Sequence, residues 1–303
     1  MYLGRLGSVL SKAANAWIDD HAQSMGAALS YYTVFSIAPL LLIAISVAGL
    51  VFGQDAAQGA VVDQLRGLIG QNGAQAIQDL LKNVSRPSSG IVATIVGLAV
   101  LVIGATSVFA ELQDDLNRIW QVPVRKKVSS WWAFLRTRLL SIGMIFAMGF
   151  MLLVSLAASA AFDAFAAWST SALAGWEGLA HGVNFVVSFV LTTALFAMIY
   201  RFMPQATIEW RDVGIGALVT ALLFTVGKTL IGLYIGKSAL ASGFGAAGSL
   251  AVLLAWVYYS AQIFLFGAEF TWAYAHAFGS RQGQDPAAQS PTAPAPATAT
   301  QPT

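Results

Sequence analysis

The sequence contains no cysteine, and only 10% of its 303 residues are charged. The missing cysteines exclude disulfide bonds, thiolate metal sites and cysteine nucleophiles, and they leave the redox compartment undetermined. With so few charges and 57% hydrophobic residues, the composition is that of a membrane protein and not of a soluble domain. The near-neutral net charge of +2 gives no argument for nucleic-acid binding.

Long apolar runs take the place of the missing charges. The run from Ser238 to Ala268 contains no ionisable side chain except two tyrosines, and it exceeds the roughly 20 residues that a helix needs to cross a bilayer. Glu269 and several aromatic residues follow it, as is typical where a helix leaves the hydrocarbon. We expect this run to form the transmembrane helix around which the chain is organised.

The pattern of apolar runs predicts an all-α, polytopic membrane protein with six transmembrane helices. The expected spans cover residues 27–52, 90–110, 139–161, 183–200, 213–235 and 245–272, within a transmembrane domain of residues 25–278. Pro39 cannot donate a backbone hydrogen bond, so we expect it to kink the first span.

Three segments lie outside these spans. Residues 1–24 place apolar side chains at helical spacing and predict an amphipathic interfacial helix, with Asp19 and Asp20 on its polar face. Residues 55–84 predict two short amphipathic helices, separated at residues 70–73, that form an outer insert between the first two spans. Residues 279–303 are rich in Pro, Ala and Thr and predict a disordered tail.

Lys and Arg are unevenly distributed between the segments that join the spans. The amino-terminal segment, residues 111–138, residues 201–211 and the tail contain 11 of them, and the opposite side contains four, with Lys228 set aside as intramembrane. Cytoplasmic segments carry the excess of basic residues. We therefore expect both termini in the cytoplasm.

Glycine spacing and a weak internal similarity bear on helix packing. Gly49 with Gly53, and Gly232 with Gly236, have the spacing that permits close helix contact. The segment at residues 26–30 also resembles the one at 216–220, and residues 109–112 resemble 267–270. The similarity is either a chance match or the trace of a repeat.

Four separated motifs resemble the YihY/BrkB family of bacterial inner-membrane proteins. They are Ala27-Ala-Leu-Ser-Tyr-Tyr-Thr-Val-Phe-Ser-Ile-Ala-Pro-Leu40, Leu116-Asn-Arg-Ile-Trp120, Tyr200-Arg-Phe-Met-Pro204 and Trp256-Val-Tyr-Tyr-Ser-Ala-Gln-Ile-Phe-Leu-Phe-Gly-Ala-Glu269. The resemblance covers residues 22–274, with Phe244 where the family more often has Tyr. It implies six helices and cytoplasmic termini in the bacterial inner membrane. Family members have been called ribonuclease BN through misassignment and have been linked to serum resistance and to lipid or lipopolysaccharide handling.

No catalytic group can be assembled from the sequence. The three histidines, His21, His181 and His276, lie on different predicted segments, so they form no visible metal cluster. Residues 243–248 match a dinucleotide-binding fingerprint, but they open a membrane helix and do not follow a strand. We expect no enzyme activity, no catalytic residue, no metal and no cofactor.

A first group of candidate substrate residues lies within the expected spans. Lys228 is the most informative, because an ionisable side chain in a span usually faces the bundle interior or an aqueous cavity. We expect it to face the interior near Pro39 and to suit an anionic headgroup; the alternative is that it snorkels to the outer interface. The cavity candidates are Lys228, Gln262, Tyr31, Tyr32, Pro39 and Tyr258.

A second group lies at the expected cytoplasmic ends of the spans. It consists of Glu111, Asp114, Asn117, Arg118, Arg201 and Glu269. The acidic residues of 111–115 beside Arg118 either form a proton or cation site or pair locally on a helix that emerges into water. Glu111 and Glu269 either share one cavity or mark the interface.

Two functions follow from these features. The leading hypothesis is an inner-membrane transporter or handler of a lipidic or anionic amphipathic substrate. The alternative is a scaffold or envelope-assembly partner that transports nothing, and a ribonuclease is the least supported. The expected partners are membrane lipids and an envelope protein at the outer amphipathic helices, with no nucleic acid. Substrate, direction of transport and oligomeric state do not follow from the sequence.

Overall fold

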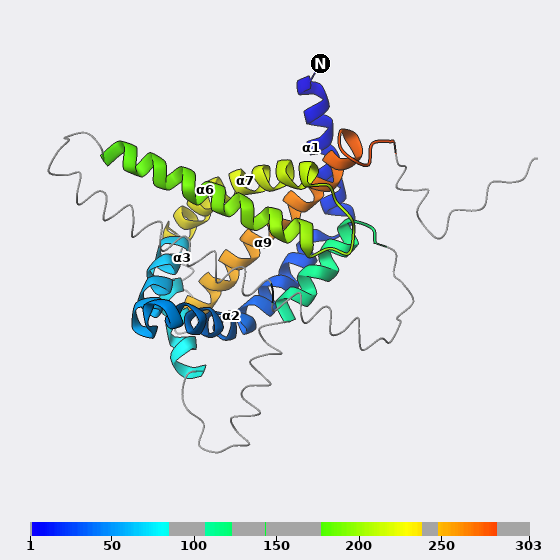
Figure 1. The fold of residues 1–303 in the computed structure, drawn as a ribbon. Coiled ribbons are helices and arrows are strands. Elements are labelled where there is room, and N and C mark those ends of the chain that lie inside the picture. The colour runs from blue at the N-terminus through cyan, green and yellow to red at the C-terminus, as the bar shows by residue number, and fades with distance from the viewer. Residues whose placement is uncertain (1, 85–106, 123–142, 144–176, 238–247, 284–303) are drawn as a thin grey trace, which may run out of the picture.

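The computed structural model describes residues 2–84, 107–122, 143, 177–237 and 248–283, and its regular elements are all α-helices (Figure 1). They are α1 (Tyr2–Asp19), α2 (Ala22–Phe52), α3 (Gln54–Val84), a helix over residues 107–119, α6 (Glu177–Phe202), α7 (Trp210–Lys237) and α9 (Gly248–Ala277). The all-α class is confirmed for these ranges. Apart from residue 143, the expected span at 139–161 lies outside the described residues, as do most of the span at 90–110 and the tail from residue 284.

The last helix, α9, is central to the described bundle. It contacts α1, α2, α3 and α7. In Figure 1, α6 and α7 lie on one side of α9, and α2 and α3 lie on the other. Hydrophobic side chains cover much of the circumference of α9, as is typical of a helix that is surrounded by other helices. This position agrees with the prediction that the last apolar run organises the chain.

Small residues let α7 approach α9 closely. A Cβ atom at Gly216 would lie 1.8 Å from Thr271 Oγ1, and one at Gly267 would lie 2.0 Å from Thr220 Oγ1. No atom outside its own helix lies within 4 Å of the Cβ position at Gly232 in the described chain, so the structure shows no close helix contact there within the subunit, and a contact between subunits stays a prediction. Spacing alone did not indicate which glycines face a neighbouring helix.

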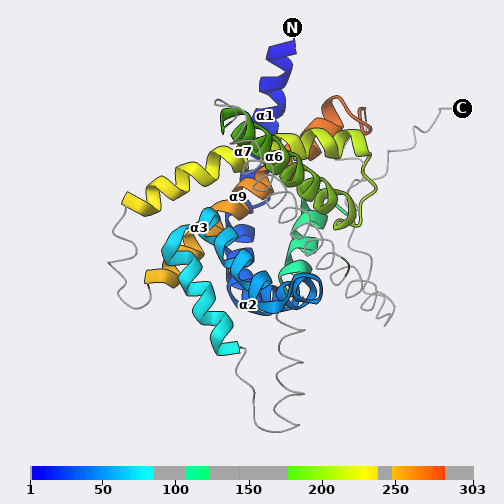
Figure 2. The ribbon, with the colours of Figure 1, turned by 60° about the vertical axis from the view of Figure 1, so that its left-hand side comes forward.

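The first span is bent, and the outer insert folds back on it. The two halves of α2, Ala22–Ile37 and Leu40–Leu50, meet at 45°, as expected from Pro39. After Gly53, which has a φ of 84°, α3 packs against α2 and the beginning of α9 (Figures 1 and 2). The predicted separation at residues 70–73 is wrong, since α3 is a single helical element. A helix can continue through glycines because its backbone hydrogen bonds need no side chain. Each interior glycine costs roughly 1 kcal/mol of helix stability, and the burial of Ile77 and Leu81 offsets this cost.

The amino-terminal helix ends earlier than expected. α1 stops at Asp19, and a turn at Asp20 and His21 leads into α2. His21 adopts the left-handed conformation with a φ of 58°, which changes the direction of the chain between α1 and α2. Asp20 therefore does not lie on the polar face of α1, contrary to expectation. The buried side chains of Val9 and Ala13 pack α1 onto the last turns of α9.

Three described helices are long and apolar enough to cross a membrane. They contain the segments Phe185–Phe202, Trp210–Tyr234 and Leu250–Ala277, and bent α2 is a fourth if its two halves form one span. These segments coincide with four of the expected spans. The complete arrangement of six stays a prediction.

Candidate functional site

Several helices end together at one end of the bundle. Here α2 begins, the helix over 107–119 ends, α6 is joined to α7 through residues 203–209, and α9 ends. We refer to it as the predicted cytoplasmic end. Gln113 Nε2 donates to the Met203 carbonyl at 2.9 Å, and the Gln205 N–H donates to Asn117 Oδ1 at 2.7 Å. These bonds fix the α6–α7 connection to the helix over 107–119.

That helix closes with its own hydrogen bonds. Gln121 has a φ of 50°, its N–H donates to the Arg118 carbonyl, and the Val122 N–H donates to the Asn117 carbonyl. This pair of bonds is the Schellman arrangement that satisfies the last carbonyls of a helix. It places Asn117 and Arg118 at the predicted cytoplasmic end.

Two arginines bind adjacent carbonyl groups of the α6–α7 connection from opposite sides. Arg201 donates to the Ile208 carbonyl, and its guanidinium lies 5.8 Å from the centre of the Trp210 ring. Arg281 donates to the Thr207 carbonyl at 3.2 Å and lies 5.2 Å from the centre of the Trp120 ring. Each guanidinium keeps further N–H groups for another acceptor, since arginine has five.

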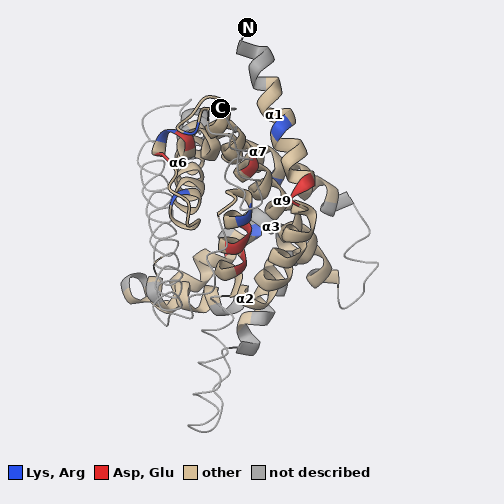
Figure 3. Ribbon diagram, turned by 90° about the vertical axis from the view of Figure 1, so that its right-hand side faces the viewer, with Lys and Arg blue, Asp and Glu red and all other residues tan. Residues whose placement is uncertain are grey.

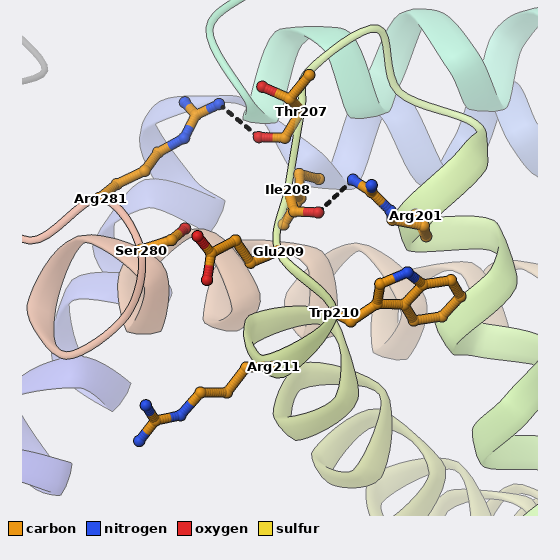
Figure 4. Close-up of a pocket in the computed structure, with 8 residues that line it drawn as sticks. All are labelled: Arg201, Thr207, Ile208, Glu209, Trp210, Arg211, Ser280 and Arg281. Carbon is orange, nitrogen blue, oxygen red and sulfur yellow. Dashed lines mark hydrogen bonds between the residues drawn. The ribbon is translucent and has the colours of Figure 1, made fainter.

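These arginines line an open pocket of about 700 Å³ (Figure 4). The lining residues are Arg201, Thr207, Ile208, Glu209, Trp210, Arg211, Ser280 and Arg281. In Figure 4 the Glu209 carboxylate points toward Ser280, and Arg211 extends away from the other labelled side chains. Three arginines against one glutamate make the lining basic.

A buried aspartate holds the chain after α9 at the edge of this pocket. Asp212, only 1% exposed, accepts hydrogen bonds from the Ser280 N–H at 3.0 Å and from the Ser280 hydroxyl at 2.7 Å. Gly279 permits the approach, because a Cβ there would lie 2.2 Å from Asp212 Oδ1. Ser280 and Arg281 are thereby positioned beside the start of α7.

Charges are sparse over the described helices (Figure 3), yet two carboxyl groups are buried near Arg118. Glu269 is 1% exposed, and its Oε1 has no hydrogen-bond partner among the described residues. Its carboxyl group lies in hydrogen-bonding contact with that of Asp20. Burial raises the pKa of Asp20, although contact with Glu269 and the charge of Arg118 oppose the shift.

Asp115 is the second buried carboxyl group. It is 6% exposed, and its Oδ2 has no hydrogen-bond partner in the described part of the chain. Burial raises the pKa of Asp115 to about 7, and the neighbouring charges of Glu111 and Asp114 add to the shift. Arg118 opposes it. Burial also raises the pKa values of Glu111 and Asp114.

The expected cytoplasmic-mouth residues thus gather at one end of the bundle but not around one cavity. Arg201 lines the pocket, Asn117 binds the α6–α7 connection, and Glu269 is buried beside Asp20. Glu111 and Asp114 lie beside Asp115 on the helix over 107–119. Arg118 acts on both Asp20 and Asp115, yet no ion pair within 4.0 Å joins it to either.

The expected cavity residues are not brought together. Lys228, Tyr31, Tyr32 and Tyr258 are exposed in the described structure, so it does not place Lys228 in the interior that we expected. The exposed neighbours of Lys228 on α7 include Val226 and Leu230. Both orientations of Lys228, toward a cavity or toward the outer interface, stay predictions.

Gln262 joins two helices in the structure, and Pro39 lies where one helix bends. Gln262 Nε2 donates to the Ala22 carbonyl at 3.3 Å, joining α9 to the start of α2. Gly26 leaves room for it, since a Cβ there would lie 2.0 Å from Nε2. Pro39 lies at the bend of α2. No group of three or more potential metal ligands lies together within the described ranges.

Sequence reasoning missed Asp20, Arg211, Asp212 and Arg281 as site residues. Arg211 and Arg281 were visible only as part of the basic excess at the cytoplasmic segments. Asp20 lay within an expected helix, and its contact with Glu269 joins positions at opposite ends of the sequence. Hydropathy carries no signal for such a contact.

Comparisons with known proteins identify the family of this chain. The model of the family described as virulence factor BrkB matches residues 13–292. Curated proteins named UPF0761 membrane protein are 27% identical over 264 residues in Verminephrobacter eiseniae and 28% identical over 269 residues in Pseudomonas paraeruginosa. These alignments cover 83% and 84% of this chain but 58% and 60% of the relatives, so the chain spans little more than half of their length. No solved structure matches. The chain therefore belongs to the BrkB family of membrane proteins.

Proposed function

We propose that this membrane protein binds an anionic amphipathic molecule at the predicted cytoplasmic end and moves it across the bilayer. The observation that carries the proposal is the basic pocket of about 700 Å³ beside two exposed aromatic side chains. Phe202 is 51% exposed and Trp210 is 55% exposed, and their rings meet edge to face at 5.8 Å. A phospholipid-like molecule has the matching chemistry, with an anionic headgroup next to an apolar body.

The arginines suit a phosphate or carboxylate group. A guanidinium presents planar, fixed donors that match such anions, and its charge strengthens each hydrogen bond. Arg201 and Arg281 are already held by backbone carbonyls and by tryptophan rings. A ligand therefore does not have to order them. Arg211 is exposed at the start of α7 and is free to turn toward a bound anion.

The exposed aromatics suit the apolar part of the same molecule. Trp and aromatic side chains at helix ends favour the interface between headgroups and hydrocarbon. Exposed apolar residues continue along α7 from Trp210 through Leu218 and Leu222. An acyl chain has a continuous apolar path along this helix.

The scaffold alternative is supported by α3. Its apolar side chains Val61, Ile77 and Leu81 are buried against α2 and α9, while Gln71 and Gln75 face outward. An envelope partner at this helix would be bound by polar groups. Such a partner, the absence of nucleic-acid binding and the absence of enzyme activity stay predictions.

Movement of labelled lipid in proteoliposomes separates the two functions. Separate vesicles carry fluorescent phosphatidylglycerol or fluorescent phosphatidylcholine in both leaflets, and an impermeant reductant bleaches only the label in the outer leaflet. We expect complete bleaching with the protein and half bleaching without it. Bleaching that equals the protein-free value for both phosphatidylglycerol and phosphatidylcholine would exclude lipid movement and leave the scaffold.

A pair of arginine substitutions tests the pocket. Arg211→Gln removes one charge at the rim, and we expect the rate to fall about fivefold, the effect of losing about 1 kcal/mol of charge–charge interaction. Arg66→Gln removes an exposed charge from α3, where it pairs with Asp63, and should leave the rate unchanged. Equal rates for both variants would place the anion site elsewhere.

The orientation of the chain is also a proposal, and it rests on the basic excess. The sequence has no cysteine, so single cysteines report cleanly. In intact cells, a cysteine at Gln75 of α3 should react with an impermeant reagent, whereas one at Gln282 should react only after lysis. The reverse pattern would overturn the orientation.

A further inference from the structure

The environment of Glu269 is unusual for a carboxylate. The side chain lies in the last third of α9 and is 1% exposed, and α1 packs against the same turns of the helix through Phe270 and Ala273. Its Oε1 is buried with no hydrogen-bond partner in the described residues. A buried carboxylate without a paired cation or a full set of donors is costly.

The group that faces Glu269 is a second carboxyl group. Asp20 comes from the turn between α1 and α2, and the two side chains are in hydrogen-bonding contact. Two carboxyl groups in hydrogen-bonding contact are stable together when one proton lies between them, because two like charges repel. The His21 backbone conformation directs the chain so that Asp20 meets α9.

No cation neutralises this pair directly. The described charged groups that act on it are Asp19 and His21 from the same turn and Arg118 from the helix over 107–119. Arg118 is exposed and forms no ion pair within 4.0 Å with Asp20 or Glu269 in the described structure. Asp19 adds negative charge. The balance of charges around the pair therefore favours the binding of a proton.

We propose that Asp20 and Glu269 form a proton-binding site in which the two carboxyl groups share one proton. The proton enters from the exposed side of Asp20 and holds the α1–α2 turn against α9. Its release leaves two facing carboxylates, which repel and separate the turn from α9. The site contains no residue of the arginine pocket, so it does not depend on the proposed lipid ligand.

Infrared spectroscopy of the purified full chain in nanodiscs tests the site. A protonated carboxyl group has a C=O stretching band separate from that of a carboxylate, and the experiment asks whether such a band is present at neutral pH. Asp115→Asn serves as the parent protein, because a proton on Asp115 would contribute its own band. We expect the parent to show the band of the shared proton.

Three substitutions in this parent separate the outcomes. Glu269→Gln should remove the band, since Asp20 is then left half-buried near Arg118 and ionises. Asp20→Asn should shift its frequency, because an amide replaces the carboxyl partner. Asp55→Asn, at an exposed position on α3 away from the pair, should change neither amplitude nor frequency.

Two results would overturn the proposal. One is a band of unchanged amplitude in Glu269→Gln, which would assign the proton to other residues. The other is an unchanged frequency in Asp20→Asn, which would show that Glu269 is not paired with Asp20. This second readout decides the question even if Glu269→Gln does not fold, because position 20 lies in a partly exposed turn.

Discussion

The hydroxyl group of Tyr200 on α6 donates a 2.7 Å hydrogen bond to the backbone carbonyl of Phe264 on α9. The same hydroxyl lies 3.1 Å from Thr220 Oγ1 on α7. Thr220 in turn donates to the Gly216 carbonyl at 2.7 Å. One buried hydroxyl group therefore joins three helices.

Removing this hydroxyl should weaken the contact between the three helices. Tyr200→Phe keeps the ring and loses the donor, and we expect the free energy of unfolding to fall by about 1 kcal/mol. Thermal unfolding in detergent, followed by circular dichroism, measures the change. Tyr258→Phe on the exposed face of α9 is the matched control and should have no effect. Equal stability of the two variants would show that the hydrogen bond contributes nothing.

Two glycine substitutions should change the free energy of unfolding in opposite directions. Gly267→Ala places a methyl group 2.0 Å from Thr220 Oγ1 and 2.6 Å from the Tyr200 hydroxyl, and overpacking of this kind costs about 1–3 kcal/mol. Gly214→Ala on α7 meets nothing within 4 Å and should stabilise the helix by up to about 1 kcal/mol. The same unfolding measurement compares them. A stable Gly267→Ala protein would contradict the close α7–α9 contact.

The sequence predicted the transmembrane helices better than the side-chain contacts between them. Four spans, the bend near Pro39 and the central role of α9 follow from apolar length and from the missing proline N–H. Hydropathy does not distinguish a side chain that faces lipid from one that faces another helix, since both surroundings are apolar. For that reason the exposed position of Lys228 could not be deduced.

The polar contacts were also beyond the sequence. Asp20 and Glu269 belong to segments whose proximity depends on how α1 turns into α2. The weak similarity between residues 26–30 and 216–220 does correspond to a shared local geometry, because Ser30 and Thr220 each donate to the carbonyl four residues earlier. Both segments also meet α9 at a glycine. A repeat is one explanation, and selection for close packing is another.

The buried Asp115 should make stability depend on pH. Its pKa is raised from 3.8 to about 7, so its contribution is fully present below about pH 4 and is lost as the pH rises through about 7. We expect the free energy of unfolding to fall by about 2 kcal/mol between about pH 4 and about pH 8, after allowance for solvent screening. Asp115→Asn should remove most of this loss, and Asp63→Asn on exposed α3 should not. A pH dependence that Asp115→Asn leaves unchanged would assign it to other groups.

The exposed position of Lys228 predicts that its charge is dispensable. Lys228→Met keeps the length and apolar stem of the side chain, so we expect lipid movement within about twofold of the unmodified protein at equal membrane abundance. The proteoliposome assay described above provides the measurement. Loss of activity in a folded, inserted Lys228→Met protein would return this residue to a substrate cavity.

Crosslinking of a bound lipid tests most directly whether the arginine pocket is the lipid-binding site. An anionic phospholipid with a photoreactive headgroup is crosslinked to the full-length protein in nanodiscs, and mass spectrometry identifies the modified residues. We expect crosslinks within residues 201–211 and 280–283, where the pocket lies, and we expect excess unlabelled phosphatidylglycerol, but not phosphatidylcholine, to suppress them. Crosslinks spread along the exposed faces of α6 and α7, with no response to either competitor, would show that the pocket does not bind the lipid.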